Sequence, residues 1–164
     1  MPGVSDSPPL FGTSHANDRL WHFAFNRLAE VNEQLVTGRE EIYFGFQFAT
    51  KAASKLPDDA VRYYIDALTA DPDALRGSFA AYRALDATIA QNRQRTTRRL
   101  TLPVLAIGAA EGYSEVTADT MKLAADNVQS VIIPGSGHYC LEEAPDEVLK
   151  ALTAFLAPAG KAPE

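Results

Sequence analysis

The chain has 164 residues, 46% of them hydrophobic, which is enough for one ordinary core or for two small subdomains. Its 15 basic and 21 acidic residues give a net charge of −6. This balance argues against a nucleic-acid binder, which needs a basic face to displace phosphate counterions. A single cysteine excludes an internal disulfide framework and a cysteine-rich metal site.

The sequence contains no apolar run of about 18 residues or more, so we expect no membrane-spanning helix. Residues 1–17 lack the basic and apolar regions of a secretory signal, which makes a cytoplasmic protein the expectation. The same residues are rich in proline, glycine and serine and are expected to form an irregular lead-in. Residues 159–164 are expected to form a short tail.

From residue 18 to residue 99 the hydrophobic residues recur at helical spacing, which predicts an all-helical segment. One or two short helices are expected over residues 19–38, with Gly38 as the stop signal. The aromatic stretch 39–54 suits a buried helix or a strand by pattern, and its length and Glu-rich start favour a helix. A helix over 56–72 follows, and residues 72–96 predict one long amphipathic helix.

The pattern changes at Leu100. Residues 100–109 form a short apolar run that ends in small residues, as a buried parallel strand does, and 128–137 form a second such run. Helical patterns occupy 114–127 and 144–158. Strand, helix, strand and helix at this spacing predict a parallel βαβ unit. Two strands alone leave unpaired edges, so the segment is expected to be the end of a larger sheet.

A single histidine, His138, follows the second apolar run directly after the turn Pro-Gly-Ser-Gly. This position suits a catalytic base, which needs a nucleophile and an orienting group; the alternative is a histidine that only caps the turn. Ser136 is two residues away but lies outside any Gly-x-Ser-x-Gly elbow, so we interpret it as a turn former. Cys140 has no feature nearby that would make a reactive thiolate.

The stretches "LPVLAIGAAEG" and "VIIPGSGHYCLEEAPDEVLKALTAFL" resemble the last two strands and last helix of the α/β-hydrolase superfamily. Upstream, "LWHFAFN" and "LRGSFAAYRAL" are similar to the helical cap of its epoxide hydrolases. The resemblance implies an α/β fold with a cap over 18–99 and a C-terminal core segment over 100–158, whose sheet is incomplete. It implies a hydrolase of epoxide hydrolase type, with the haloalkanoate dehalogenases as a related branch. It also implies a small apolar, epoxide-like substrate and no cofactor or metal.

The same resemblance implies roles for three residues. His138 matches the histidine that activates water, and His22 and Tyr82 match two cap positions that assist ring opening. Opening an epoxide leaves negative charge on its oxygen, so donors placed at that oxygen lower the barrier. By pattern alone His22 and Tyr82 would be core residues, because both lie among aromatic or apolar neighbours.

In the family the nucleophile is an aspartate in a Gly-His-Asp-x-Gly elbow, and neither this pattern nor a His-Gly-x-Pro loop occurs in the sequence. The orienting acid of the matched subgroup would fall just before Met1. We therefore expect a truncated chain that is inactive on its own. Glu111 is a candidate substitute acid for His138, the alternative being an exposed loop glutamate. The acidic residues at 142, 143 and 146 are expected in the first turn of the last helix, where they suit its dipole.

A second hypothesis is a non-catalytic binding or assembly module. An incomplete sheet exposes its edges and apolar surface, which predicts a homodimer through the sheet edge or pairing with another chain.

Overall fold

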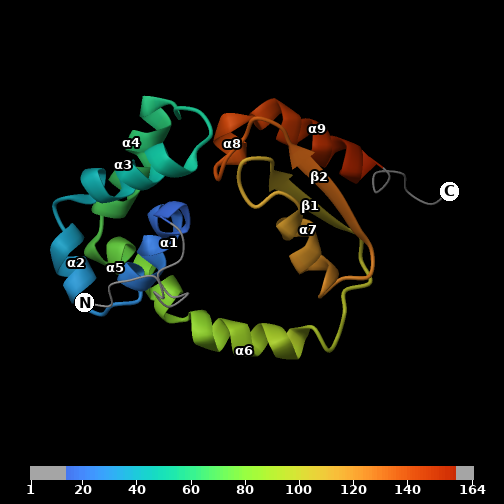
Figure 1. Cartoon of the computed structure of the whole chain (residues 1–164), viewed down its shortest axis with the longest axis horizontal. Coiled ribbons are helices and arrows are strands. Elements are labelled where there is room, and N and C mark those ends of the chain that lie inside the picture. The colour runs from blue at the N-terminus through green and yellow to red at the C-terminus, as the bar shows by residue number, and fades with distance from the viewer. Residues whose placement is uncertain (1–13, 158–164) are drawn as a thin grey trace.

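The structure, a computed structural model, describes residues 14–157, so the expected tail at 159–164 and most of the expected lead-in lie outside the described residues. Helix α1 (Ser14–Asn26) already begins within the stretch that we expected to be irregular as far as residue 17. Among residues 14–157 six helices precede the first strand, and four elements follow that strand in the order helix, strand, helix, helix. Figure 1 shows the helical part on one side and the α/β part on the other.

The helical part consists of α1 and five more helices, as the periodicity predicts. These are α2 (Val31–Val36), α3 (Glu40–Lys51), α4 (Asp58–Thr69), α5 (Pro72–Arg83) and α6 (Leu85–Arg95). The start of α5 follows from its sequence, because the Asp71 side chain accepts a 2.8 Å hydrogen bond from the Asp73 N–H and Pro72 occupies the first turn. The core of this part is a cluster of four buried side chains, namely Val36, Tyr43, Leu75 and Phe79.

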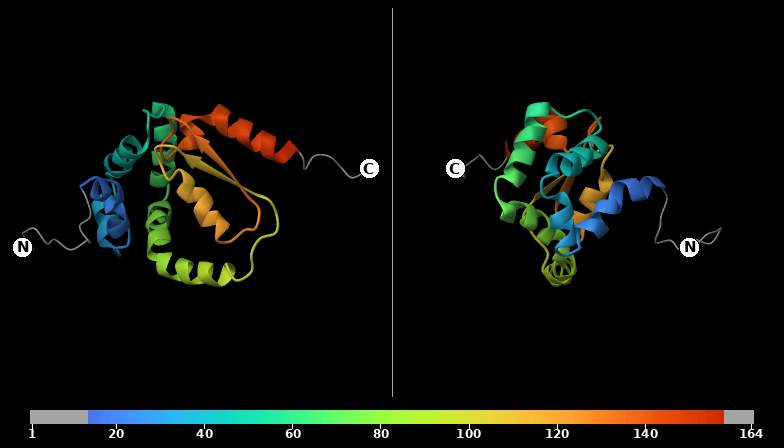
Figure 2. Two further views of the ribbon diagram at one scale, coloured as in Figure 1. Left: turned by 45° about the vertical axis from the view of Figure 1, so that its right-hand side comes forward. Right: turned by 90° about the vertical axis from the view of Figure 1, so that its left-hand side faces the viewer.

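The single long helix expected over 72–96 is wrong, since α5 and α6 are separate helices that meet at Ala84. Helix α5 buries an apolar face, whereas α6 buries no residue. Arg83 holds the end of α5 through a 2.8 Å hydrogen bond to the Leu28 carbonyl and an ion pair of 2.8 Å with Glu33. The spacing of apolar residues continues through Ala84, so periodicity alone does not reveal the bend. Figures 1 and 2 show α6 running from the helical part toward the loop that enters the sheet.

The α/β part forms the expected parallel βαβ unit. Its elements are β1 (Val104–Ala109), α7 (Glu115–Lys122), β2 (Val128–Ile133), α8 (Cys140–Glu143) and α9 (Pro145–Leu156). The strands pair in parallel from Val104 with Val128 to Ala109 with Ile133. Helices α7 and α9 both contact the sheet, and Figure 2 shows them on opposite sides of it.

Within residues 14–157 the sheet has two strands, so each strand has one edge without a partner strand. Large apolar side chains also remain exposed on this part, among them Leu102, Leu149 and Leu156. No helix of the described residues is long and apolar enough to cross a membrane.

Candidate active site

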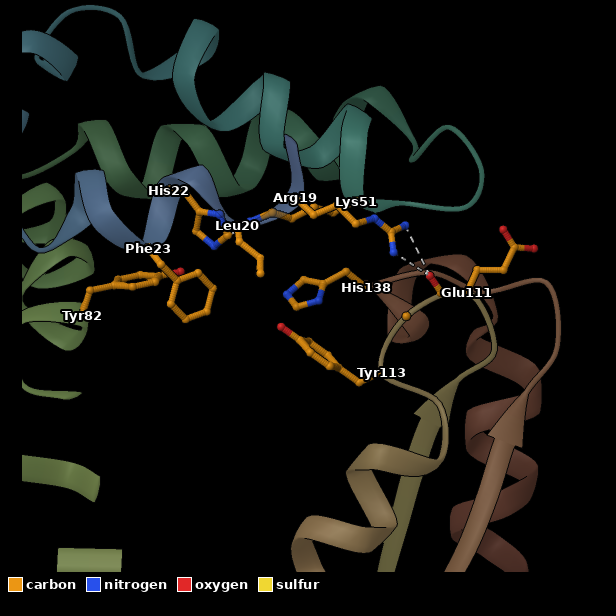
Figure 3. A pocket seen from close by; sticks show the side chains of 10 residues that line it. Arg19, Leu20, His22, Phe23, Lys51, Tyr82, Glu111, Tyr113 and His138 are labelled. Atoms are coloured by element: carbon orange, nitrogen blue, oxygen red, sulfur yellow. Dashed lines mark hydrogen bonds between the residues drawn. The ribbon is translucent and has the colours of Figure 1, made fainter. Parts of the chain in front are cut away.

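A cavity of about 330 Å³ lies where the helical part meets the α/β part. Its lining residues come from five separate segments, so the fold brings together residues that lie far apart in the sequence (Figure 3). The lining residues are Arg19, Leu20, His22 and Phe23 of α1, Lys51 of α3, Tyr82 of α5, Glu111, Gly112 and Tyr113 after β1, and His138 after β2.

The turn that follows β2 presents His138 to this cavity. Gly135 adopts a positive φ of 65° within the turn, a conformation that glycine takes without strain. The His138 N–H donates to the Lys51 carbonyl at 2.9 Å, and the imidazole lies near the Tyr113 ring with a centroid separation of 6.1 Å. Desolvation and the nearby Lys51 charge lower the pKa of His138, although Glu143 raises it in part. A neutral imidazole at neutral pH can act as a base.

The turn also packs directly against the end of α3. A Cβ added at Gly137 would lie 2.5 Å from the Ala53 nitrogen and 2.6 Å from the Lys51 carbonyl oxygen, so only glycine fits there. Ser136, which we expected to be a turn former, is fully buried, and its Oγ has no hydrogen-bond partner. Cys140 begins α8 and does not line the cavity.

Glu143 lies at the end of the separate helix α8, so the expectation that it sits in the first turn of the last helix is wrong. Its carboxylate accepts four backbone hydrogen bonds and thereby joins the histidine turn to the segment after α3. The donors are Gly137 at 3.0 Å, Tyr139 at 3.1 Å, Ala53 at 2.7 Å and Ser54 at 3.2 Å. We call this arrangement the Glu143 clamp. Glu142 is also in α8 and accepts a hydrogen bond from the Tyr64 hydroxyl, whereas Asp146 does lie in the first turn of α9.

His22 is 4% exposed and sits on the cavity side of α1. Its Nε2 lies 3.1 Å from the Lys51 ammonium nitrogen, while its Nδ1 is buried and has no hydrogen-bond partner. Burial and the Lys51 charge lower the pKa of His22 to about 4, against a smaller opposing effect of the Arg19 backbone. The ring is therefore neutral at neutral pH.

Tyr82 lies on α5 opposite His22, with a separation of 5.7 Å between the ring centroids. It is half-buried and also contacts the edge of the Phe23 ring. Burial raises the pKa of Tyr82 above its ordinary value, so its hydroxyl remains protonated and able to donate. The two cap positions that the resemblance implies therefore face the same cavity as His138.

Glu111 reaches the cavity through its backbone. Its carbonyl oxygen accepts from the Arg19 guanidinium at 3.4 and 3.5 Å, and its side chain is exposed. Figure 3 shows the Glu111 carboxylate pointing away from His138. In this conformation the carboxylate does not orient the imidazole.

Lys51, Arg19 and Tyr113 also line the cavity, and no signal in the sequence pointed to them. A lysine in the last turn of a helix usually indicates only a favourable interaction with the helix dipole, and an arginine among exposed residues carries no signal. Burial lowers the pKa of Lys51 to about 8, so the amine is mostly protonated at neutral pH. Among the described residues, no group of three or more histidine, cysteine or acidic side chains is placed to hold a metal ion.

The fold of the chain is similar to that of several solved structures. The chain is 33% identical to Cfl2 from Burkholderia cenocepacia, with a TM-score of 0.78 over 94% of this chain and 52% of that one. The Cif epoxide hydrolase from Acinetobacter nosocomialis is 24% identical, with a TM-score of 0.76 over 83% of this chain and 44% of that one. The epoxide hydrolase CorEH is 20% identical, with a TM-score of 0.79 over 96% and 55% of the two chains. No protein-family model and no curated protein sequence matches the chain.

The fold is therefore that of an α/β-hydrolase. The solved structures that share this fold include epoxide hydrolases, and the chain corresponds to only a part of that fold. It spans about half the length of the solved structures that it matches.

Proposed function

We propose that the cavity is the cap-side portion of an epoxide hydrolase active site that takes a small apolar epoxide. The observation that carries this proposal is that His22, Tyr82 and His138 line one cavity although they come from three different elements. We place the boundary between cap and core near residue 99, and the change from helices to strands between α6 and β1 supports this division.

In this proposal each residue has a defined role. Donors on the cap side of the cavity, with Tyr82 among them, stabilise the negative charge that develops on the epoxide oxygen. His138, whose lowered pKa keeps it neutral, removes a proton from the water that cleaves a covalent ester intermediate. That ester needs a carboxylate nucleophile, and the printed sequence lacks the Gly-His-Asp-x-Gly pattern that would supply it. The chain alone is therefore expected to bind the epoxide without turning it over.

Binding can be tested directly on this chain. Titration with a terminal epoxide such as styrene oxide should shift the NMR signals of the His22 and His138 rings. Tyr82→Phe should weaken that binding, whereas the matched control Tyr63→Phe, at an exposed position, should not. Absence of any shift, or equal effects of the two variants, would contradict the assignment of the cavity.

Turnover is tested separately by comparing wild type with His138→Ala on the same epoxides. Equal background rates are expected. Hydrolysis that His138→Ala abolishes would overturn the proposal that the isolated chain is inactive, and would point to residual base catalysis by His138, worth roughly 10²–10⁴-fold.

A second candidate function is assembly. The strand edges that lack partners in the described residues, and the exposed leucines on α9, favour a homodimer through the sheet edge or pairing with another chain. Sedimentation should then show a concentration-dependent dimer. A clean monomer across the concentration range would count against this function.

A further inference from the structure

Lys51 occupies an unusual place for a lysine, since its side chain runs from the last turn of α3 into the cavity instead of into solvent (Figure 3). Its ammonium nitrogen lies 2.5 Å from Gln47 Oε1 and 3.1 Å from His22 Nε2. Gln47 and His22 are both buried. Two buried side chains therefore fix the position of one cation at the cavity wall.

The hydrogen-bond chemistry of these three groups determines which atoms carry protons. An ammonium group has three N–H donors and no acceptor, so His22 Nε2 must accept from it. A neutral imidazole that accepts at Nε2 carries its proton on Nδ1, which is the nitrogen without a partner. His22 consequently cannot donate from Nε2 into the cavity while Lys51 is charged.

The charge on Lys51 is not balanced by a carboxylate. Among the described side chains, neither Lys51 nor Arg19 forms an ion pair. The Glu111 carboxylate points away from the cavity, and that of Glu143 is occupied by four backbone donors. Lys51 has three donors and two partners, which leaves one N–H for a ligand.

We propose that Lys51 is the charged hydrogen-bond donor of this cavity, held by His22 Nε2 and Gln47 as acceptors, and that its third N–H binds a negatively charged oxygen of the ligand. In an epoxide the oxygen released by ring opening has this chemistry, as does a carboxylate carried by the substrate. The binding of an anionic oxygen stands on the geometry alone. Only the use of this N–H on a ring-opened epoxide rests on the proposed function. In that reaction Lys51 and Tyr82 would donate to the epoxide oxygen, and His22 would position Lys51.

The charged and titratable groups that face Lys51 influence its pKa. Besides His22, the charged or titratable residues of the cavity lining are Arg19 on α1, Tyr82 on α5, Glu111 and Tyr113 after β1, and His138 after β2. The Glu111 carboxylate points away from the cavity, so it does not face Lys51. None of the groups that face Lys51 is an acid that is ionised at neutral pH, so an anion that enters the cavity should stabilise the charged form of Lys51 and raise its pKa.

The tautomer of His22 can be read from ¹⁵N–¹H correlations of the unliganded wild-type chain. The Nδ1–H form is expected at neutral pH, and it should change with a midpoint of about 8, where Lys51 loses its proton and can accept from Nε2. An Nε2–H form at neutral pH would overturn the proposal.

Anion binding is tested with sodium acetate, against sodium chloride at equal ionic strength, by following the Lys51 ¹³Cε signal. Acetate should raise the pKa of Lys51, and an unchanged pKa would overturn the proposal. Lys51→Met should abolish the acetate effect on the His22 and His138 signals. Lys55→Met, which removes an exposed lysine four residues away, should preserve it. If the two variants respond alike, the proposal fails. These readouts need no epoxide, so failure of the proposed function would leave them intact.

Discussion

Replacement of Glu143 by alanine is expected to weaken the junction between the helical part and the α/β part. The substitution removes the acceptor of four backbone N–H groups. Those of Ala53 and Ser54 are exposed and can be hydrated, whereas those of Gly137 and Tyr139 are partly buried. Hydrogen bonds to a charged group contribute about 1.5–3 kcal/mol each and hydration recovers part of this, so we expect a loss of about 2–4 kcal/mol.

Urea denaturation measures this loss as a lower midpoint at an unchanged slope. The matched control is Glu142→Ala, since Glu142 is the adjacent residue and makes one exposed contact with the Tyr64 hydroxyl. Its loss should stay below about 1 kcal/mol. Equal losses for the two variants would refute the Glu143 clamp as the stabilising feature.

The clamp also predicts a pH dependence. Burial raises the pKa of Glu143, but the four N–H donors outweigh it and hold the pKa below its ordinary value of 4.5. The contribution of Glu143 is therefore fully present above pH 4.5 and is lost as the pH falls through the lower, folded-state pKa. Glu143→Gln should lack this dependence. If the stability of Glu143→Gln falls with acid as steeply as that of wild type, the titration belongs to other groups.

Three further outcomes are expected. Gly137→Ala forces a Cβ against the Ala53 nitrogen and the Lys51 carbonyl and should lower the free energy of unfolding by about 1–3 kcal/mol in the same urea assay. The matched control Gly45→Ala, which has open space around it in α3, should be neutral or stabilising by up to about 1 kcal/mol. Phe79→Ala empties the fully buried centre of the cap and should lower stability by about 3–5 kcal/mol, measured in urea. NMR titration should give His138 a pKa below 6.5, and Lys51→Met should raise it, because the lysine charge disfavours the imidazolium; an unchanged value would contradict that cause.

The sequence predicts the order of elements well because each rests on local signals. Parallel strands read as apolar runs, and the confirmed pairing of β1 with β2 follows from the helix between them. The break between α5 and α6 was not predictable, since a bend at one residue leaves the hydrophobic spacing intact. The break depends on tertiary contacts, because Arg83 at the end of α5 binds the Leu28 carbonyl and Glu33.

The residues of the candidate site also differ in whether the sequence identifies them. His138 is identifiable because its turn and the preceding strand are contiguous in the sequence, and the resemblance points to His22 and Tyr82. Lys51 becomes visible only in the structure, because its significance depends on His22 and Gln47, and a lysine at a helix end has no pattern that distinguishes it. The roles proposed for all four residues depend on contacts between segments that are distant in the sequence. The periodicity of apolar residues carries no information about such contacts.

Lys51 connects the two sides of the cavity. Its backbone carbonyl accepts from the His138 N–H, while its side chain holds His22, so one residue fixes the base and the cap side of the cavity together. The Glu143 clamp joins the same two segments only a few residues away. A change that separates the end of α3 from the histidine turn should therefore disturb both sides of the cavity at once. Glu143→Ala provides that test: if its NMR signals move at His138 but not at His22, cap and core are positioned independently, and the cavity is not one coupled site.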